Sequence, residues 1–196
     1  MERRTFGKTG LQISPLGFGG APVGFLETEQ EAVATILNEL LDQGVNLIDT
    51  AARYDGSEEM IGKAISRRRD DYVLVSKCGH AMDGVKGAAW SEEVILNTVD
   101  RALRRLQTDF LDVMLLHTCD FATLKRGEAV GALVKAQEAG KIRFLGFAGD
   151  NESAAYAAGL ETISVIETSI NICDQANIDY VPVSYTHLTL PTSDLV

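Results

Sequence analysis

The stretch Gly44-Val45-Asn46-Leu47-Ile48-Asp49-Thr50-Ala51-Ala52-Arg53-Tyr54 decides the fold, because it joins a short apolar run directly to a polar loop. The run over residues 46–49 has the length of a β-strand and ends at a carboxylate. Leu47 and Ile48 are adjacent and both apolar, so both faces of this strand would be buried. A strand of that kind is typical of a parallel sheet covered by helices.

The same arrangement repeats along the chain. Further apolar runs of strand length cover residues 16–19, 72–77, 111–117, 142–147 and 163–167. Segments with the spacing of an amphipathic helix separate the runs, and these cover residues 29–43, 58–66, a stretch that begins at an N-cap at Ser91, 127–140 and 152–159. A regular alternation of strands and helices predicts an α/β protein with a parallel sheet.

Two architectures fit this alternation, a doubly wound open sheet and a (β/α)₈ barrel. A dinucleotide-binding open sheet would carry G-x-G-x-x-G after its first strand, but here Gly17-Phe18-Gly19-Gly20 leads into Ala21-Pro22, where we expect a loop. The barrel is therefore favoured, although a barrel has eight strands and typically about 250 residues. We predict an incomplete (β/α)₈ TIM barrel with about six βα units, which forms one partial domain over residues 1–181.

The composition excludes several classes of protein. The chain has 196 residues, 45% of them hydrophobic, and a formal net charge of -10, which argues against nucleic acid as a partner. No apolar run reaches the roughly 18 residues that a membrane span needs. Cys78, Cys119 and Cys173 are too few and too scattered for a disulfide framework or a zinc site, so we expect no bound metal and a cytoplasmic protein. We expect Cys78 and Cys119 to serve packing rather than redox chemistry.

Four polar residues stand where the chemistry of a barrel is found. Asp49, Lys77 and His117 end the second, third and fourth apolar runs, and Tyr54 lies five residues after Asp49. The carboxyl ends of barrel strands meet on one face, which carries the active site in enzymes of this fold. The four side chains are therefore expected on one rim, from neighbouring strands.

The residues around these positions resemble the aldo-keto reductase family. The stretch from Gly44 to Tyr54, followed by Ser57-Glu58-Glu59-Met60-Ile61-Gly62, is similar to the family's signature around its catalytic Asp and Tyr. Val75-Ser76-Lys77 resembles the lysine strand, and Leu115-Leu116-His117 resembles the histidine strand. The opening residues 4–14 resemble the N-terminal β-hairpin that plugs the barrel floor in bacterial members. The resemblance extends from about residue 3 to about residue 179.

This resemblance implies a reductase that uses NADP(H) on a small carbonyl or alcohol substrate. Tyr54 would be the general acid, and the ammonium group of Lys77 would lower the pKa of the phenol. Asp49 would hold Lys77 by an ion pair, and His117 would orient the substrate oxygen. The hydride chemistry itself would belong to the cofactor.

The cofactor contacts that the resemblance implies match the family less closely. Asp49 and the residues after the first strand, Gly19, Gly20 and Ala21, are expected near the nicotinamide. The family's Ser-Asn pair after the fifth strand is replaced here by Ala148 and Gly149. Glu167 replaces the glutamine that commonly ends the sixth strand. The remaining contacts would come from a seventh and an eighth strand.

Two other functions remain open on the sequence alone. The first is a barrel that binds nicotinamide as a sensor without catalysis, for which Tyr54 and Lys77 would not be needed together. The second is an aldolase in which Lys77 forms a Schiff base, which would leave Tyr54 and His117 without a role.

The last residues have a different character. Residues 183–192 back-translate to a sequence that resembles a sequencing-library adapter, and residues 182–196 are expected to be a non-native tail. An open barrel would expose strand edges and apolar surface. We therefore expect a chain of this length to be prone to aggregation and to have little activity.

Overall fold

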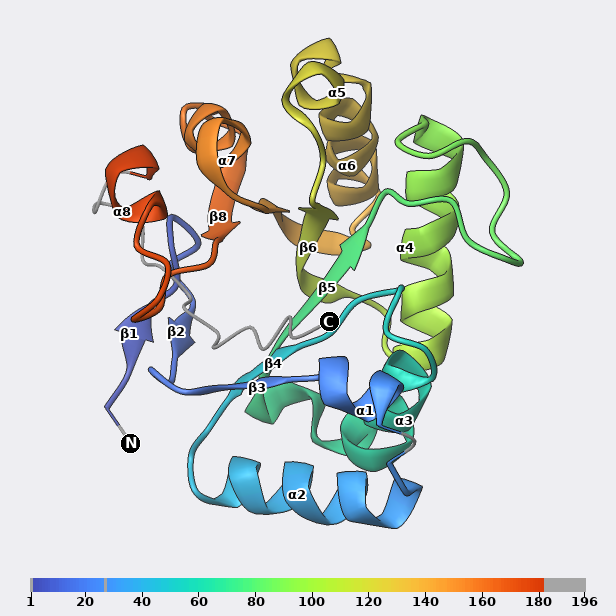
Figure 1. The fold of residues 1–196 in the computed structure, drawn as a ribbon. Coiled ribbons are helices and arrows are strands. Elements are labelled where there is room, and N and C mark those ends of the chain that lie inside the picture. Colours follow the sequence, from blue (N-terminus) through green and yellow to red (C-terminus); the bar gives the residue numbers. More distant parts are fainter. Residues whose placement is uncertain (1, 27, 182–196) are drawn as a thin grey trace.

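The computed structural model describes residues 2–26 and 28–181. Six parallel strands form one sheet in the order β3-β4-β5-β6-β7-β8, so that each strand pairs with the next one along the chain. Their bounds are β3 (Gly17–Gly19), β4 (Leu47–Asp49), β5 (Val73–Cys78), β6 (Leu111–His117), β7 (Ile142–Ala148) and β8 (Ile163–Glu167). Figure 1 shows that the sheet curls as the strands follow one another, with helices on its outer side. The structure confirms the predicted incomplete barrel.

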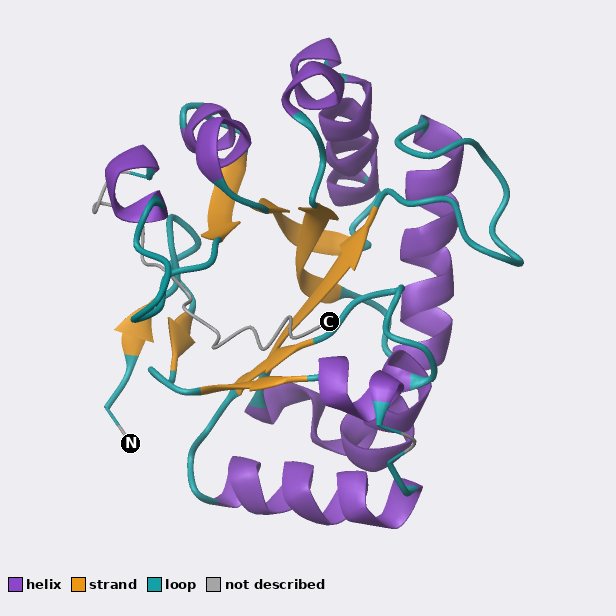
Figure 2. Cartoon of the chain, in the orientation of Figure 1, coloured by secondary structure: helices purple, strands orange, loops and turns teal. Residues whose placement is uncertain are grey.

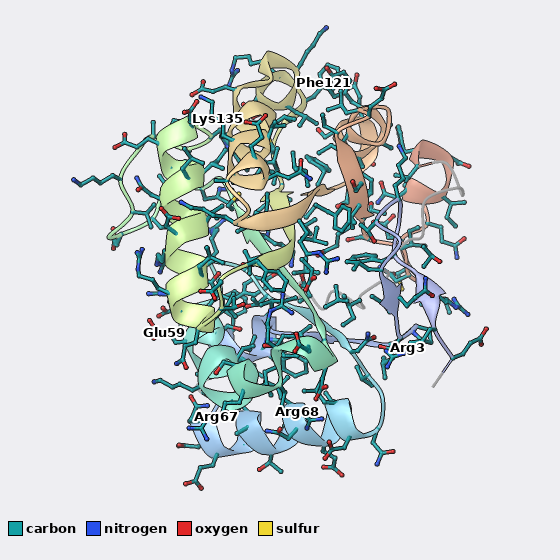
Figure 3. The ribbon with its side chains drawn as sticks, turned by 180° about the vertical axis from the view of Figure 1, so that it is seen from behind. Arg3, Glu59, Arg67, Arg68, Phe121 and Lys135 are labelled. Carbon is teal, nitrogen blue, oxygen red and sulfur yellow. The ribbon has the colours of Figure 1, made fainter. Side chains whose placement is uncertain are left out.

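Five helices connect successive strands and cover the outside of the sheet (Figure 2). They are α2 (Gln30–Asp42), α3 (Ser57–Ile65), α4 (Glu92–Leu106), α6 (Glu128–Glu138) and α7 (Asn151–Ala158). Helix α4 begins as its sequence predicts, because the Ser91 side chain accepts a hydrogen bond from the amide of Val94. Charged side chains such as Arg67, Arg68 and Lys135 point outward from the helical layer (Figure 3).

Four short helical segments were not expected from the sequence. They are α1 (Ala21–Phe25), η1 (Ser66–Asp71), α5 (Phe121–Arg126) and α8 (Asn177–Tyr180). The prediction of a loop at Ala21-Pro22 was wrong, because these residues begin α1. Proline fits the first turn of a helix, where an N–H group would have no partner within the helix.

The strands separate two apolar layers. One cluster lies between sheet and helices, and its members from β5 and β6 include Leu74, Met114 and Leu116. The other lies inside the curl and includes Val75, Val113, Leu115, Ala148 and Val165. Side chains alternate between the two faces of a strand, so residues two apart share a face. This alternation decides which strand-end residues point into the barrel.

The N-terminal hairpin, predicted as a plug of the barrel floor, packs against the inner cluster of the sheet. It consists of β1 (Arg4–Thr5) and β2 (Gln12–Ile13), which pair antiparallel. Phe6 is 1% exposed and belongs to the inner cluster. The Lys8 amide donates a hydrogen bond to the backbone oxygen of Ser164, so the hairpin is attached to β8. Figure 1 shows the hairpin beside β8 and α8.

In the part of the chain that the structure describes, no helix combines the length and the apolar character that crossing a membrane requires. The tail expected at residues 182–196 lies outside the described residues.

Candidate active site

The three strand-end residues share the inner face of the sheet. In β5, Lys77 is two residues after the inward-facing Val75, and in β6, His117 is two residues after Leu115. In β4, Asp49 is likewise two residues after the inner Leu47. The alternation of side chains along a strand thus points all three groups inward at the carboxyl end of the sheet. This is the rim that the sequence predicted.

Lys77 and Asp49 form a buried ion pair. Lys77 Nζ lies 2.5 Å from Asp49 Oδ2, and these side chains are 1% and 3% exposed. The ammonium group also donates to the backbone oxygen of Thr50 at 3.3 Å. Burial acts to lower the pKa of Lys77, but the surrounding carboxylates outweigh it and raise the pKa above its usual value. Lys77 is therefore a cation held in place by its partners.

Tyr54 is held over this pair by the loop after β4. Its amide donates to the backbone oxygen of Ala51, and its own backbone oxygen accepts from the amide of Ser57, the first residue of α3. Lys77 Nζ lies 5.2 Å from the centroid of the Tyr54 ring. The His117 ring meets the same phenol edge to face, with centroids 5.9 Å apart. The structure thus brings Asp49, Tyr54, Lys77 and His117 together.

The pKa of Tyr54 is raised in this structure, whereas the family resemblance led us to expect a lowered value. Burial is the largest effect and raises the pKa of the phenol above its usual value. Lys77 does act in the lowering direction, but Asp49 and Glu167 raise the pKa again because they carry negative charge close to the ring. The expectation from the sequence took the effect of Lys77 into account but not the opposing effect of Asp49 and Glu167.

His117 is a neutral imidazole at physiological pH. Burial, followed by the positive charge of Lys77, lowers the pKa of His117 to about 3. A neutral imidazole carries one N–H donor and one acceptor nitrogen, so His117 can donate one hydrogen bond without bringing a further charge to the rim. A neutral His117 would be able to serve the orienting role that the family resemblance implies.

Glu167 ends β8 and faces Lys77. Glu167 Oε1 lies 3.3 Å from Lys77 Nζ, and the Glu167 side chain is 14% exposed. Burial and the nearby Asp49 raise the pKa of Glu167 to about 8. The sequence placed Glu167 among the cofactor contacts, and the structure shows in addition that it is a second carboxyl group beside Lys77.

Small residues stand beside these polar groups at the ends of β3 and β7. Gly19 pairs with Asp49, and Ala148 pairs with both His117 and Glu167, so all of them lie on the same rim. A side chain at Gly19 would find no atom within 4 Å. The rim therefore has open space next to its charged groups, which suits a flat ring such as nicotinamide.

Two of the expected cofactor contacts have backbone amides that are already occupied. The amide of Gly20 donates to the backbone oxygen of Asp49, and that of Gly149 donates to the backbone oxygen of Glu167. Ala21 is the first residue of α1. Gly20 also packs closely against α3, because a Cβ atom there would lie 2.8 Å from Ser57 Oγ. These residues shape the rim through packing and leave few free donors.

An aromatic wall beside the rim was missed in the sequence. His80 lies three residues after Lys77, and its ring centroid is 5.5 Å from that of His117 and 4.9 Å from that of Trp90. On the other side, the ring of Phe25 meets Tyr54 edge to face at 5.6 Å, and Phe25 is 63% exposed. The position of His80, in the loop that follows the lysine strand, was the signal that could have identified it.

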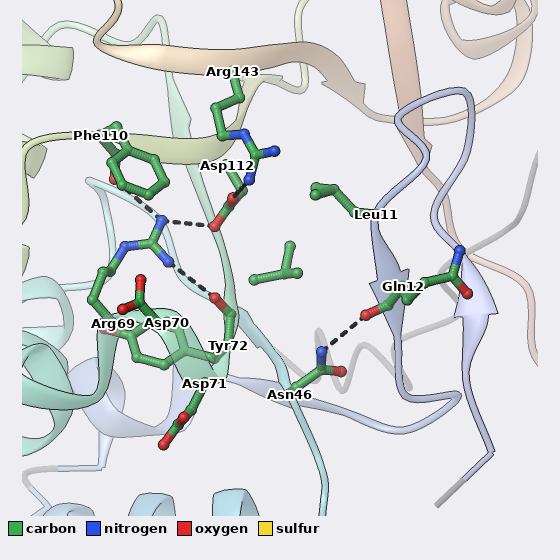
Figure 4. Close-up of a pocket in the computed structure, with 11 residues that line it drawn as sticks. Leu11, Gln12, Asn46, Arg69, Asp70, Asp71, Tyr72, Phe110, Asp112 and Arg143 are labelled. Carbon is green, nitrogen blue, oxygen red and sulfur yellow. Dashed lines mark hydrogen bonds and ion pairs between the residues drawn. The ribbon is translucent and has the colours of Figure 1, made fainter.

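The opposite end of the strands has a hollow of its own. A cavity of about 250 Å³ is lined by residues that precede or begin the strands, among them Asn46, Tyr72, Asp112 and Arg143 (Figure 4). Asp112 is buried there and pairs with Arg143 at 2.8 Å and with Arg69 at 2.6 Å. Asp112 is thus held between two arginines, and the cavity is separate from the rim that carries Lys77 and His117.

Cys78 and Cys119 lie near the rim but are buried and free. Burial is the main cause that raises the pKa of both thiols, to about 12 for Cys119. A thiolate is the reactive form of cysteine, so neither residue has reactive character. Among the described residues no group of three or more His, Cys, Asp and Glu side chains is placed to hold a metal ion.

Comparisons with known proteins agree with this geometry. The model of the Aldo/keto reductase family matches residues 15–183. L-galactose dehydrogenase of Arabidopsis thaliana is 37% identical over 159 residues, which are 76% of this chain and 49% of that protein. An uncharacterised oxidoreductase of Bacillus subtilis is 35% identical over 74% of this chain and 48% of its own length. The chain spans about half the length of these curated relatives.

Solved structures show the same fold. The holo form of an aldo-keto reductase from Bacillus halodurans superposes with a TM-score of 0.75 at 30% identity, over 87% of this chain and 58% of the other. A Pseudomonas aeruginosa protein of the aldo-keto reductase type superposes with a TM-score of 0.81 at 31% identity, over 89% of this chain and 70% of the other. With the rim of Asp49, Tyr54, Lys77 and His117 in place, these matches show that the chain belongs to the aldo/keto reductase family.

Proposed function

We propose that this rim carries out the NADP(H)-dependent interconversion of a small carbonyl compound and its alcohol. The observation that carries the proposal is the buried Lys77–Asp49 pair directly below the Tyr54 ring. When bound, the dihydronicotinamide supplies a hydride to the carbonyl carbon, and the cofactor is left oxidised. The residues of the chain then have to hold the substrate oxygen and give it a proton.

We assign the proton to Tyr54 and the orientation to His117. The Tyr54 hydroxyl would donate its proton to the carbonyl oxygen as that oxygen gains negative charge, and the resulting phenolate would be stabilised by Lys77. Neutral His117 would donate its N–H to the same oxygen. The open space at Gly19 and the small Ala148 leave room on the rim for the flat reacting ring.

The environment of Lys77 disfavours the aldolase alternative. A lysine that forms a Schiff base must be a neutral amine, and enzymes obtain it by lowering the pKa of that lysine. Here the two carboxyl groups raise the pKa of Lys77, and the ammonium is held at 2.5 Å and 3.3 Å from them. The sensor alternative leaves the position of Tyr54 over this pair without a purpose.

The substrate class is proposed from the relatives. Their names include L-galactose dehydrogenase, D-arabinose 1-dehydrogenase and L-glyceraldehyde 3-phosphate reductase. We propose a small hydroxylated aldehyde or its alcohol for this protein as well, so glyceraldehyde is a suitable probe. The free, largely buried cysteines favour a reduced cytoplasm as its compartment.

We further propose that residues 1–181 are part of a longer catalytic domain. The sheet ends at β3 and β8, and the curated relatives are about twice as long as the matched region. Strands that pair with these edges would cover apolar surface and complete the cofactor site. The 196-residue chain is therefore expected to reduce glyceraldehyde slowly.

The test compares wild type with Tyr54→Phe and with the matched variant Tyr156→Phe, which removes a hydroxyl from a side chain of α7 that packs against the cluster between sheet and helices. We expect Tyr54→Phe to reduce the rate of NADPH oxidation by at least about 100-fold while NADPH still quenches the protein fluorescence. Tyr156→Phe should retain the wild-type rate. An unchanged rate in Tyr54→Phe would contradict the proposal. Trapping of a Lys77 adduct by borohydride without NADPH would favour the aldolase.

A further inference from the structure

The catalytic lysine has two carboxyl partners, and the proposed reaction uses only one of them. Asp49 contacts Lys77 Nζ from β4 at 2.5 Å, and Glu167 contacts it from β8 at 3.3 Å. These two strands lie at opposite sides of the sheet, so the curl of the half-barrel brings their ends together above Lys77. Glu167 faces inward because it is two residues after Val165, which belongs to the inner cluster.

The two carboxyl groups also interact with each other. Burial raises the pKa of both groups, and the interaction between them acts to lower the pKa of Asp49 and to raise that of Glu167 further. Asp49 has the shorter contact with Lys77, so Glu167 is the carboxyl group that takes up a proton more readily. Two buried carboxylates close together cannot both ionise easily, which is the general reason for one raised pKa in such a pair.

The charges that face Glu167 can be named from each neighbouring element. Asp49 comes from β4, Lys77 from β5 and Tyr54 from the loop after β4. The adjacent strand β7 contributes only the methyl group of Ala148 at this level. His117 ends β6 on the same rim and is neutral. The charge of the cluster is therefore decided by Glu167, because Lys77 and Asp49 cancel one another.

We propose that Glu167 is a positioning residue: by its carboxyl group beside Lys77, it sets how readily the Tyr54 phenol gives up and takes back its proton. The inference rests on the proposed role of Tyr54 as the proton donor. With Glu167 protonated, the Lys77–Asp49 pair is neutral overall and Lys77 can stabilise a phenolate. With Glu167 ionised, the cluster carries one negative charge and disfavours the phenolate.

Glu167 thereby couples the direction of the reaction to pH. Carbonyl reduction leaves a phenolate at Tyr54, and alcohol oxidation begins from one. An ionised Glu167 keeps the Tyr54 phenol protonated to a higher pH. Alcohol oxidation, which begins from the phenolate, therefore requires a higher pH. In a Glu167→Gln variant, Lys77 would pair with a single carboxylate. The Tyr54 phenolate would then form at a lower pH.

The test measures the ionisation of Tyr54 directly in the 196-residue chain. Tyrosine is labelled with ¹³C at Cζ, and the Tyr54 signal is assigned by its loss in Tyr54→Phe. Wild type is compared with Glu167→Gln, which keeps the size of the side chain, and with Glu161→Gln, which removes the same charge from an exposed turn. We expect the midpoint for Tyr54 to fall by about one pH unit in Glu167→Gln and to stay unchanged in Glu161→Gln.

A midpoint in folded Glu167→Gln within about 0.2 units of wild type would overturn the inference, since one nearby charge shifts a pKa by about a unit or more. If Glu167→Gln does not fold, the ¹³C signal of Glu167 Cδ in wild type decides instead. A Glu167 midpoint near that of a free glutamate would overturn the inference, and a Tyr54 signal that moves in step with a late-titrating Glu167 would support it.

The proposed function fails in a different way. The rates of glyceraldehyde reduction and of glycerol oxidation are measured across pH with the same three chains and with Tyr54→Phe. If none of the chains oxidises NADPH but the Tyr54 midpoint shifts, the proposed reaction is wrong and the role of Glu167 in setting the phenol stands. If turnover depends on Tyr54 but the midpoint does not shift, the reaction stands and the inference about Glu167 is wrong.

Discussion

The ammonium nitrogen of Lys77 lies 2.5 Å from a carboxylate oxygen of Asp49, and both side chains are almost completely buried. Removing one member of a buried ion pair leaves the other charge without compensation, which typically costs about 3 to 5 kcal/mol. Glu167 remains as a second partner of Lys77 and moderates this loss. The pair therefore contributes to stability as well as to the site.

Asp49→Asn is expected to lower the free energy of unfolding by about 3 kcal/mol. The matched control is Asp100→Asn, because Asp100 and Lys141 form an ion pair of the same length, 2.5 Å, with side chains that are 40% and 37% exposed. An exposed pair contributes at most about 1 kcal/mol. Urea denaturation measures the free energy of unfolding of both variants. Equal losses would show that the buried Asp49 contributes no more to stability than the exposed Asp100.

The raised pKa of Glu167 predicts that stability falls as the pH rises. Glu167 has a pKa of about 8 in the folded chain, against a usual value of 4.5. The folded state therefore binds more protons than the unfolded state between these values, and the free energy of unfolding decreases across this window, by at most about 1.4 kcal/mol per pH unit. In Glu167→Gln, this decrease of the free energy of unfolding with pH should be absent. Denaturation at pH 5 and pH 8 measures it, and identical slopes in the two chains would contradict the assignment.

His117 is expected to remain neutral throughout the physiological range. Its pKa of about 3 means that ¹⁵N NMR should show no protonation of this ring between pH 5 and pH 8. His117→Ala should slow turnover by about 100-fold, since it removes a donor to the reacting oxygen. An inflection of the wild-type rate that disappears in His117→Ala would show instead that the ring titrates during the reaction.

The hairpin plug is expected to be necessary for folding. Phe6 is 1% exposed inside the curl, and replacing a buried phenylalanine by alanine costs about 3 to 5 kcal/mol. Phe25→Ala is the matched control, since Phe25 is 63% exposed. In thermal unfolding, the melting temperature of Phe6→Ala should be clearly lower than that of Phe25→Ala. Equal melting temperatures would show that the hairpin does not stabilise the half-barrel.

Much of this fold follows from local pattern. The strand at residues 111–117 was predicted with the bounds that β6 has, because five of its seven residues are apolar and it ends in the polar His117. Ser91 signalled the start of α4 by its capping side chain. The short helix α1 was not predicted, because Gly20 and Pro22 are both common in loops and its five residues carry no helical periodicity.

The candidate site was predicted in its members but not in its electrostatics. Asp49, Lys77 and His117 are each recognisable as polar residues that end an apolar strand. The contact between Lys77 and Glu167 joins residues 90 positions apart and depends on the curl of the sheet, which local pattern does not specify. For the same reason the sequence did not indicate that burial and two carboxylates raise the pKa of Tyr54.

The transfer of deuterium from NADPH labelled at the hydride-donating carbon tests the central claim most directly. The chain is incubated with labelled NADPH and glyceraldehyde, and the glycerol is analysed by mass spectrometry. We expect one deuterium on the former carbonyl carbon of each glycerol molecule, and no labelled product with Tyr54→Phe. Glycerol without deuterium, or labelled glycerol at the wild-type rate from Tyr54→Phe, would contradict this claim.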